Sequence, residues 1–158
     1  MLVVVGSHSA IGQAQARALA ATGIPAVEYR AADLVAMTET ELAGALPDRP
    51  GSTVVSLTGD VDPDLRERAA AALAAICAPA VRSAGVVVLS GGATARAVLT
   101  AAGVTSLRLL GELAPGAVLS RPNGTAHSTH VITKSGSFGD DHTLVRLVAA
   151  ITASKGRP

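Results

Sequence analysis

Three short segments of the sequence combine glycine with serine or threonine directly after a run of apolar residues. They are Gly6–Ser9, Ser90–Thr94 and Lys134–Gly139. Glycine allows a backbone to come close to a bound anion, and the N–H groups at the start of a following helix point towards that anion. Serine and threonine hydroxyls add further donors. Each segment therefore indicates phosphate binding, with a tight turn and a helix cap as the alternative for any one of them alone.

The sequence matches neither of the two common nucleotide-binding motifs. A P-loop requires glycine immediately before its lysine, whereas Thr133 precedes Lys134. The dinucleotide fingerprint requires glycine at the positions of His8 and Ile11. Lys134 still supplies a mobile positive charge within a loop of hydroxyls and glycines. The local patterns therefore indicate an anion site without specifying its ligand.

Four histidines and one cysteine are the candidate metal ligands. They are His8, His127, His130, His142 and Cys77. Their spacing matches no zinc motif, and a single cysteine cannot form a disulfide within the chain. Cys77 lies in an alanine-rich helical stretch, where a buried, inert thiol is expected. We predict no metal site, and the spacing assigns no catalytic residue.

Aspartates cluster at two places where helices are expected to begin. Asp60, Asp62 and Asp64 alternate in a turn, which is reminiscent of calcium ligands. The glycine and distal glutamate of an EF-hand loop are missing, so helix capping by Asp62 or Asp64 explains them better. The pair Asp140–Asp141 is expected to open the last helix, where negative charge is favourable.

Strand and helix patterns alternate along the chain. Apolar runs predict strands at residues 2–5, 25–29, 53–57, 85–89, 107–110 and 131–133, and helices are expected at 9–21, 38–46, 63–82, from the turn at 90–92 to about 103, and at the C-terminal end. A capping box of Thr38 and Glu41 begins the second helix. Residues 113–130 carry turn signals and are expected to be looser. The pattern predicts one three-layer α/β domain over residues 1–158, with a mostly parallel sheet and helices on both faces.

The composition argues against several classes of partner. Thirteen basic and twelve acidic residues give a net charge of +1, and the chain has one Phe, one Tyr and no Trp. It therefore lacks both the positive field and the stacking rings that nucleic-acid binding requires. No apolar run approaches the length of a signal peptide or a membrane span. We expect no nucleic-acid or membrane partner and a cytoplasmic location.

Four motifs in order give a more specific indication than any one loop. They are Gly6-Ser7-His8-Ser9 with Gln15, Gly91-Gly92-Ala93-Thr94-Ala95, Gly111-Glu112-Leu113-Ala114-Pro115-Gly116 and Lys134-Ser135-Gly136-Ser137-Phe138-Gly139. The series resembles the C-terminal nucleotide-binding domain of the four-carbon acid sugar kinases, from about Leu2 to Ala150. Those enzymes phosphorylate acids such as threonate, erythronate and 3-oxo-tetronate with ATP.

The resemblance implies an ATP site with Mg²⁺ and a phosphoryl-transfer role. The nucleotide-binding residues that it implies are Ser7, Ser9, Gly91, Gly92, Ala93, Thr94, Gly111, Glu112, Lys134, Ser135, Gly136, Phe138 and Gly139. Lys134 is the candidate for offsetting phosphate charge. Glu112 is expected either to contact the ribose or a magnesium-bound water, or to be a solvated loop carboxylate.

The sequence departs from the family pattern in four respects. Ala93 stands where the family has an acidic residue, Val118 replaces a proline, and Gly12 replaces a threonine. The sugar-acid-binding domain expected before the first strand is absent from the sequence, and the acceptor-activating base is expected on that domain. We therefore expect a domain that binds ATP or ADP and phosphorylates a sugar acid only with that domain supplied in trans.

Two alternative functions and the assembly state are left open. A non-catalytic nucleotide sensor or interaction module is the main alternative, because Ala93 and the missing domain both favour it. A Rossmann-type oxidoreductase has only the α/β pattern in its favour, since the glycine fingerprint fails. The sequence leaves the oligomeric state open, with a homodimer among the possibilities.

Overall fold

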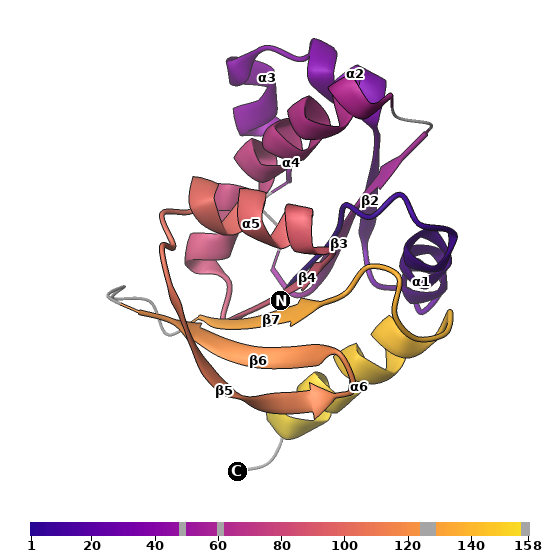
Figure 1. Cartoon of the computed structure of the whole chain (residues 1–158), viewed down its shortest axis with the longest axis vertical. Coiled ribbons are helices and arrows are strands. Elements are labelled where there is room, and N and C mark those ends of the chain that lie inside the picture. The colour runs from indigo at the N-terminus through magenta and orange to yellow at the C-terminus, as the bar shows by residue number, and fades with distance from the viewer. Residues whose placement is uncertain (48–49, 60–61, 124–128, 156–158) are drawn as a thin grey trace.

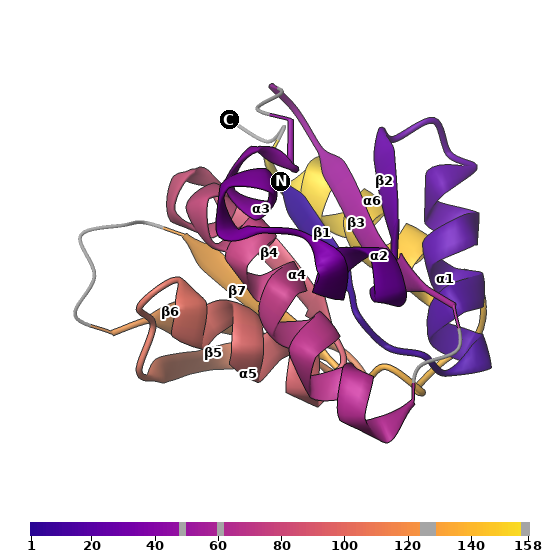
Figure 2. The same cartoon turned by 90° about the horizontal axis from the view of Figure 1, so that it is seen from above.

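The middle layer of the molecule is a seven-stranded sheet with the order β2-β3-β1-β4-β7-β6-β5 (Figure 1 and Figure 2). The computed structural model describes residues 1–47, 50–59, 62–123 and 129–155. Strands β2, β3, β1, β4 and β7 are parallel, whereas β6 and β5 continue the sheet in antiparallel fashion. The strands are β1 Leu2–Val5, β2 Ala26–Arg30, β3 Thr53–Thr58, β4 Val86–Ser90, β5 Leu107–Ala114, β6 Ala117–Pro122 and β7 His130–Lys134. The predicted mostly parallel sheet is confirmed.

Helices cover both faces of this sheet. They are α1 Ala10–Ala20, α2 Ala31–Ala36, α3 Glu39–Gly44, α4 Pro63–Ser83, α5 Gly92–Ala101 and α6 Thr143–Lys155. One core joins the sheet to α2, α4 and α5, and a second core on the opposite face joins it to α1 and α6. No helix in the described parts of the chain has the length and apolar character needed to cross a membrane.

The continuous apolar runs of the sequence form the centre of the sheet. Every residue of β1 and of β4 is buried. Alternate residues of each strand face opposite cores, so that Val87 contributes to the core with α4 and α5, and Val88 to the core with α1 and α6. A strand buried on both faces needs apolar residues at every position. These runs therefore form the middle of the sheet. The glycine-rich segments follow directly after its strands in the sequence.

The structure corrects the expectation for residues 113–130. Strand β5 extends to Ala114, and β6 returns beside it to form a β-hairpin. Most of β5 is exposed, and the pattern that predicted a strand at residues 107–110 covers only its first half. The turn signal at Pro115–Gly116 was correct, but it marks a hairpin turn and not a long loop. The short helix α2 was also missed, because it has only six residues and no side-chain cap.

The capping predictions can be compared with the structure at three sites. The capping box of Thr38 and Glu41 is confirmed, with the Thr38 amide donating to Glu41 Oε2 at 2.7 Å. The backbone oxygen of Asp62 accepts from the first turn of α4. The Asp140 carboxylate accepts from the His142 amide at 3.0 Å, just before α6. Asp60, His127 and the Asp64 side chain lie outside what the structure describes.

Candidate phosphate-binding site

The three glycine-rich segments meet at one edge of the sheet. Strands β1, β4 and β7 are adjacent and parallel, and their last residues pair in the order Val5, Ser90, Lys134. The loops that follow must therefore leave the sheet side by side. They pack so closely that a side chain on Gly6 would overlap the Thr94 hydroxyl, and a Cβ on Gly136 would lie 2.5 Å from Ser7 Oγ.

Ser9 links the first glycine-rich segment to the third through hydrogen bonds. Its hydroxyl accepts from the Gly12 amide at 3.0 Å, which makes Ser9 the N-cap of α1. The same hydroxyl donates to the Gly136 carbonyl at 3.0 Å and lies 3.0 Å from Ser7 Oγ. The helix-cap interpretation of this hydroxyl therefore holds, and Ser9 also positions the loop that follows β7.

The start of α5 brings helix amides without intrahelical partners to this edge. Gly91 is its N-cap with a φ of +105°, which favours glycine, and its amide donates to the Lys134 carbonyl at 2.8 Å. The first amides of a helix have no intrahelical partner and carry a partial positive charge. Gly92 and Ala93 are exposed, and α5 has no acidic residue in its first turn. Thr94 is buried against Gly6, so its hydroxyl positions the loops.

A cavity of about 700 Å³ opens between these loops and the start of α4, and we call it the phosphate cradle. Residues 6–9, 91–94, 136 and 137 line one side, and Arg66 and Glu67 of α4 line the other. Sequence reasoning missed both α4 residues. The signal that could have found them was the predicted helix from residue 63. This helix follows the carboxyl end of β3 and therefore starts at the same edge of the sheet.

The ionisable side chains that line the cradle are Arg66, Glu67 and His8. Burial lowers the pKa of His8, the positive charge of Arg66 lowers it further, and a hydrogen bond to the Gly59 backbone opposes both effects. Among the described residues, Arg66 forms no ion pair, so its guanidinium is available to an anion.

Lys134 does not line the cradle. Its side chain is 3% exposed, and its ammonium group donates to the Ser135 carbonyl. Burial lowers its pKa. No carboxylate in the described part of the chain pairs with it. Its register partner Ser90 is fully buried, with a hydroxyl that has no hydrogen-bond partner among the described residues. Burying a positive charge without a counter-charge is unfavourable, so an anion bound nearby would stabilise the Lys134 ammonium group.

The third motif forms the end of β5 and the hairpin turn beside the cradle. The Glu112 carboxylate accepts from the Gly116 amide at 2.8 Å and so braces this turn. Gly111 lies where the register of β5 against β6 shifts. Neither residue lines the cradle, so nucleotide contact by Gly111 or Glu112 stays a prediction.

The hairpin turn and the loop after β7 pack against each other. A Cβ on Gly116, whose φ is +73°, would lie 3.1 Å from the Phe138 ring. The Gln15 side-chain amide donates to the carbonyls of Phe138 and Asp140 at 3.0 and 2.8 Å. The four motifs, far apart in the sequence, are thus brought together at one edge of the sheet.

The candidate metal ligands do not gather around the cradle. Within the described residues, no group of three or more His, Cys, Asp or Glu side chains is placed to hold a metal ion. Cys77 is buried in α4, as predicted, and burial raises the pKa of its thiol to about 12. His130 and His142 lie outside the cradle.

Known proteins share this arrangement of sheet, loops and helices. A family model described as the nucleotide-binding C-terminal domain matches residues 2–144. D-threonate kinase of Cupriavidus necator is 36% identical over 96 residues, which is 60% of this chain and 23% of the kinase. The chain therefore spans about a quarter of that curated relative.

Solved structures agree with the sequence comparison. A domain of unknown function from Bordetella bronchiseptica, solved with bound citrate as a domain-swapped dimer, is 29% identical with a TM-score of 0.78. The match covers 96% of this chain and 40% of that one. A putative tRNA synthase from Salmonella typhimurium LT2, 18% identical with a TM-score of 0.69, covers 92% of this chain and 39% of that one and shows the shared fold alone.

Sheet, helix start and converging loops define an α/β nucleotide-binding domain. The chain belongs to the nucleotide-binding C-terminal domain family, and it is similar to part of a D-threonate kinase. The resemblance drawn from the four sequence motifs is thereby confirmed.

Proposed function

We propose that this domain binds ATP, with the phosphates in the cradle, and serves phosphoryl transfer to a four-carbon sugar acid. The observation that carries this proposal is the convergence of three glycine-rich loops on the start of α5. Phosphoryl transfer needs positioned phosphates and neutralised charge more than covalent help from the protein. The cradle offers backbone amides at Gly92 and Ala93, with Arg66 opposite them.

Lys134 and Glu67 have further roles in this proposal. A phosphate over the loop after β7 would attract the buried Lys134 ammonium, which has no carboxylate partner among the described residues. Glu67 is a carboxylate within the cradle, and Mg²⁺ typically takes one or two carboxylates together with phosphate oxygens and water. Glu67 therefore fits a magnesium ion held between protein and phosphates. We place the acceptor site and its activating base on a sugar-acid-binding domain in trans.

The binding claim is tested by calorimetric titration of the purified chain with a non-hydrolysable ATP analogue and Mg²⁺. We expect saturable binding with a stoichiometry of about one. Absence of heat at millimolar nucleotide would contradict the proposal.

Light scattering of the same sample tests homodimer formation, for which the Bordetella domain-swapped dimer is the precedent.

A non-catalytic nucleotide sensor or interaction module is the second candidate function. The observation in its favour is Ala93, which leaves the first turn of α5 without an acidic residue. Such a module would bind nucleotide equally well. Once a sugar-acid-binding domain is present, a kinase domain would turn over ATP, whereas a non-catalytic module would not.

A further inference from the structure

Three basic side chains lie side by side across the hairpin strands β5 and β6 and the neighbouring strand β7. Arg108 of β5 is the register partner of Arg121 of β6, and the Arg121 guanidinium donates to Nε2 of His130 on β7 at 3.2 Å. Directly opposite residues of antiparallel strands place their side chains on the same face of the sheet, with Cβ atoms about 4.5–5.5 Å apart. We call these three residues the basic row.

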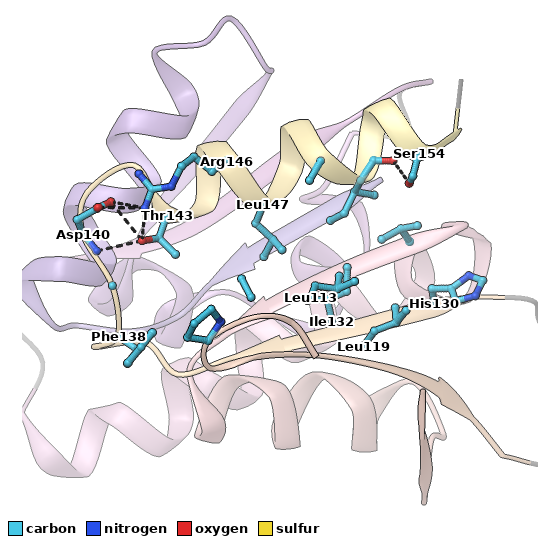
Figure 3. A pocket seen from close by; sticks show the side chains of 16 residues that line it. Leu113, Leu119, His130, Ile132, Phe138, Asp140, Thr143, Arg146, Leu147 and Ser154 are labelled. Atoms are coloured by element: carbon cyan, nitrogen blue, oxygen red, sulfur yellow. Dashed lines mark hydrogen bonds and ion pairs between the residues drawn. The ribbon is translucent and has the colours of Figure 1, made fainter. Parts of the chain in front are cut away.

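The basic row and the phosphate cradle lie at opposite ends of β7. His130 is the first residue of this strand, whereas the cradle is lined by the loop that follows its last residue, Lys134. The four steps from His130 to Lys134 span about 13 Å. Figure 3 shows the same separation along the cavity of about 800 Å³ beside α6, with His130 and Ser154 at one end and Asp140 at the other. The basic row is therefore distinct from the cradle.

The two arginines of the basic row carry like charges without a counter-charge. No carboxylate in the described part of the chain pairs with Arg108 or Arg121, and both side chains are exposed. Like charges directly opposite each other on neighbouring strands are destabilising. The hairpin keeps them aligned nonetheless, because the Asn123 amide donates to the Ser106 carbonyl at 3.1 Å and the Asn123 side chain bonds to the Ser106 hydroxyl at 3.2 Å. An anion between the two guanidinium groups would remove this repulsion.

The donors of the basic row suit a phosphate group better than a carboxylate. Arginine can only donate, so Nε2 of His130 accepts from Arg121 and the ring proton lies on Nδ1. One guanidinium fork can satisfy both oxygens of a carboxylate. A phosphate group carries about −1.5 to −2 charges and at least three acceptor oxygens, which is enough for two forks. Two arginines opposite each other therefore favour the phosphate group.

We propose that the basic row is a second oxyanion site, which takes a phosphate group either as inorganic phosphate or as the end of a phosphomonoester. The phosphate oxygens accept from Arg108 and Arg121, and His130 orients the Arg121 guanidinium through their hydrogen bond. The bound group supplies the counter-charge that the two arginines lack. This inference does not rest on the proposed nucleotide binding, because the basic row and the cradle share no residue.

Histidine side-chain NMR separates the two sites in one titration. His130 reports on the basic row, His8 reports on the cradle, and the exposed His142 belongs to neither. Wild type is titrated at constant pH and ionic strength with inorganic phosphate, with glycerol 3-phosphate and, as a carboxylate control, with acetate. We expect the His130 signal to shift and saturate with phosphate and not with acetate. Saturation with glycerol 3-phosphate as well would extend the site to phosphomonoesters, and saturation with inorganic phosphate alone would restrict it to the free ion.

Arg108→Gln tests the site and its electrostatic origin together, because it removes one guanidinium and leaves the bond between Arg121 and His130 in place. We expect phosphate binding, followed at His130, to weaken by about tenfold, as for the loss of one charged hydrogen bond. Without phosphate, the variant should melt at a higher temperature than wild type, because the like-charged pair is gone. Added phosphate should raise the melting temperature of wild type more than that of the variant.

Arg17→Gln is the matched control. Arg17 is exposed on α1 and lines neither the cradle nor the cavity beside α6. This variant should bind phosphate at His130 as wild type does and should not melt at a higher temperature.

Two results would overturn the proposal. One is a His130 signal that shifts no more with phosphate than with acetate, and the other is equal phosphate affinity at His130 in wild type and Arg108→Gln. A response of His8 without one of His130 would remove the second site and leave the cradle standing. A response of His130 alone would support the basic row and count against the cradle.

Discussion

At the scale of single residues, the charge of the phosphate cradle depends partly on α4 side chains that belong to none of the four sequence motifs. Arg66 reaches the cradle from α4, and among the described residues it has no carboxylate partner. His8 beside it has a lowered pKa because burial and the arginine both disfavour a second positive charge. The pair thus presents one fixed positive charge and one imidazole whose protonation the arginine disfavours.

Removing the Arg66 guanidinium should weaken nucleotide binding. We expect Arg66→Ala to lower ATP affinity by about tenfold, or ~1.4 kcal/mol, since a charge-assisted contact to phosphate is lost. Arg68→Ala, on the same helix but away from the cradle, is the matched control and should bind as wild type does. Calorimetry measures both variants. Equal affinities for the two variants would remove Arg66 from the site.

The lowered pKa of His8 should make stability depend on pH. Its folded value lies below the ordinary 6.5, so the unfolded chain binds more protons between the two values. The stabilisation is therefore fully present above about pH 6.5 and is lost as the pH falls through the folded value. Thermal melting of wild type should weaken from pH 7 to pH 5, and less so for His8→Gln. The exposed His142→Gln is the control, and identical slopes for wild type and His8→Gln would contradict the assignment.

At the scale of elements, close packing of loops shapes the cradle. Gly6 and Gly136 lie at the ends of β1 and β7, and each touches a hydroxyl side chain of a neighbouring segment. These contacts hold the first amides of α5 next to the loop after β7.

The alternation of strands and helices was predictable from the sequence, because apolar runs and helical spacing are local properties. Of the β5–β6 hairpin, only the first half of β5 was predicted, because the exposed residues beyond Leu110 continue no apolar run.

A methyl group on Gly6 should separate these elements. Gly6→Ala would overlap Thr94, and we expect a loss of about 1–3 kcal/mol in the free energy of unfolding together with weaker ATP binding. Gly44→Ala in α3 is the matched control, since nothing lies within 4 Å of its Cβ position. Denaturant titration and calorimetry measure the two effects. A Gly6→Ala protein as stable as wild type would show that the loops have room to move apart.

A carboxylate at position 93 should couple nucleotide binding to magnesium. Ala93 is exposed in the first turn of α5, where an aspartate is favourable for the helix but repels phosphate. We expect Ala93→Asp to weaken ATP binding severalfold in EDTA and to regain it when Mg²⁺ bridges the carboxylate and the phosphates. Calorimetry with and without Mg²⁺ tests this, with wild type as the reference. An unchanged magnesium dependence would place residue 93 away from the phosphates.

At the scale of the whole molecule, the chain corresponds to one part of its relatives. It covers 40% of the Bordetella structure and 23% of the D-threonate kinase. The acceptor site is proposed to lie on a second domain. Catalysis is therefore expected to require two domains, with the nucleotide domain presenting the transferable phosphate.

Turnover should therefore appear only when the domains are combined. We expect this chain alone to convert no ATP to ADP at a measurable rate when four-carbon sugar acids are present. When it is mixed with the sugar-acid-binding domain of a relative, we expect phosphoryl transfer from ATP to the sugar acid. The Ala93→Asp variant should give the higher rate, because it restores the acidic residue typical of the family. ADP release measures both. No turnover by either protein at saturating partner would favour the non-catalytic module.

The sequence by itself determined the fold class and the family, because these follow from local patterns and their order, and it predicted phosphate binding by the glycine-rich loops. Only the tertiary structure decided which groups face one another. The adjacency of β1, β4 and β7 brings together Ser9 and Gly136, which are 127 residues apart. The same long-range pairing places Arg66 in the cradle and Phe138 against the hairpin turn. Strand order depends on the packing of the whole chain, and no local spacing of residues encodes it.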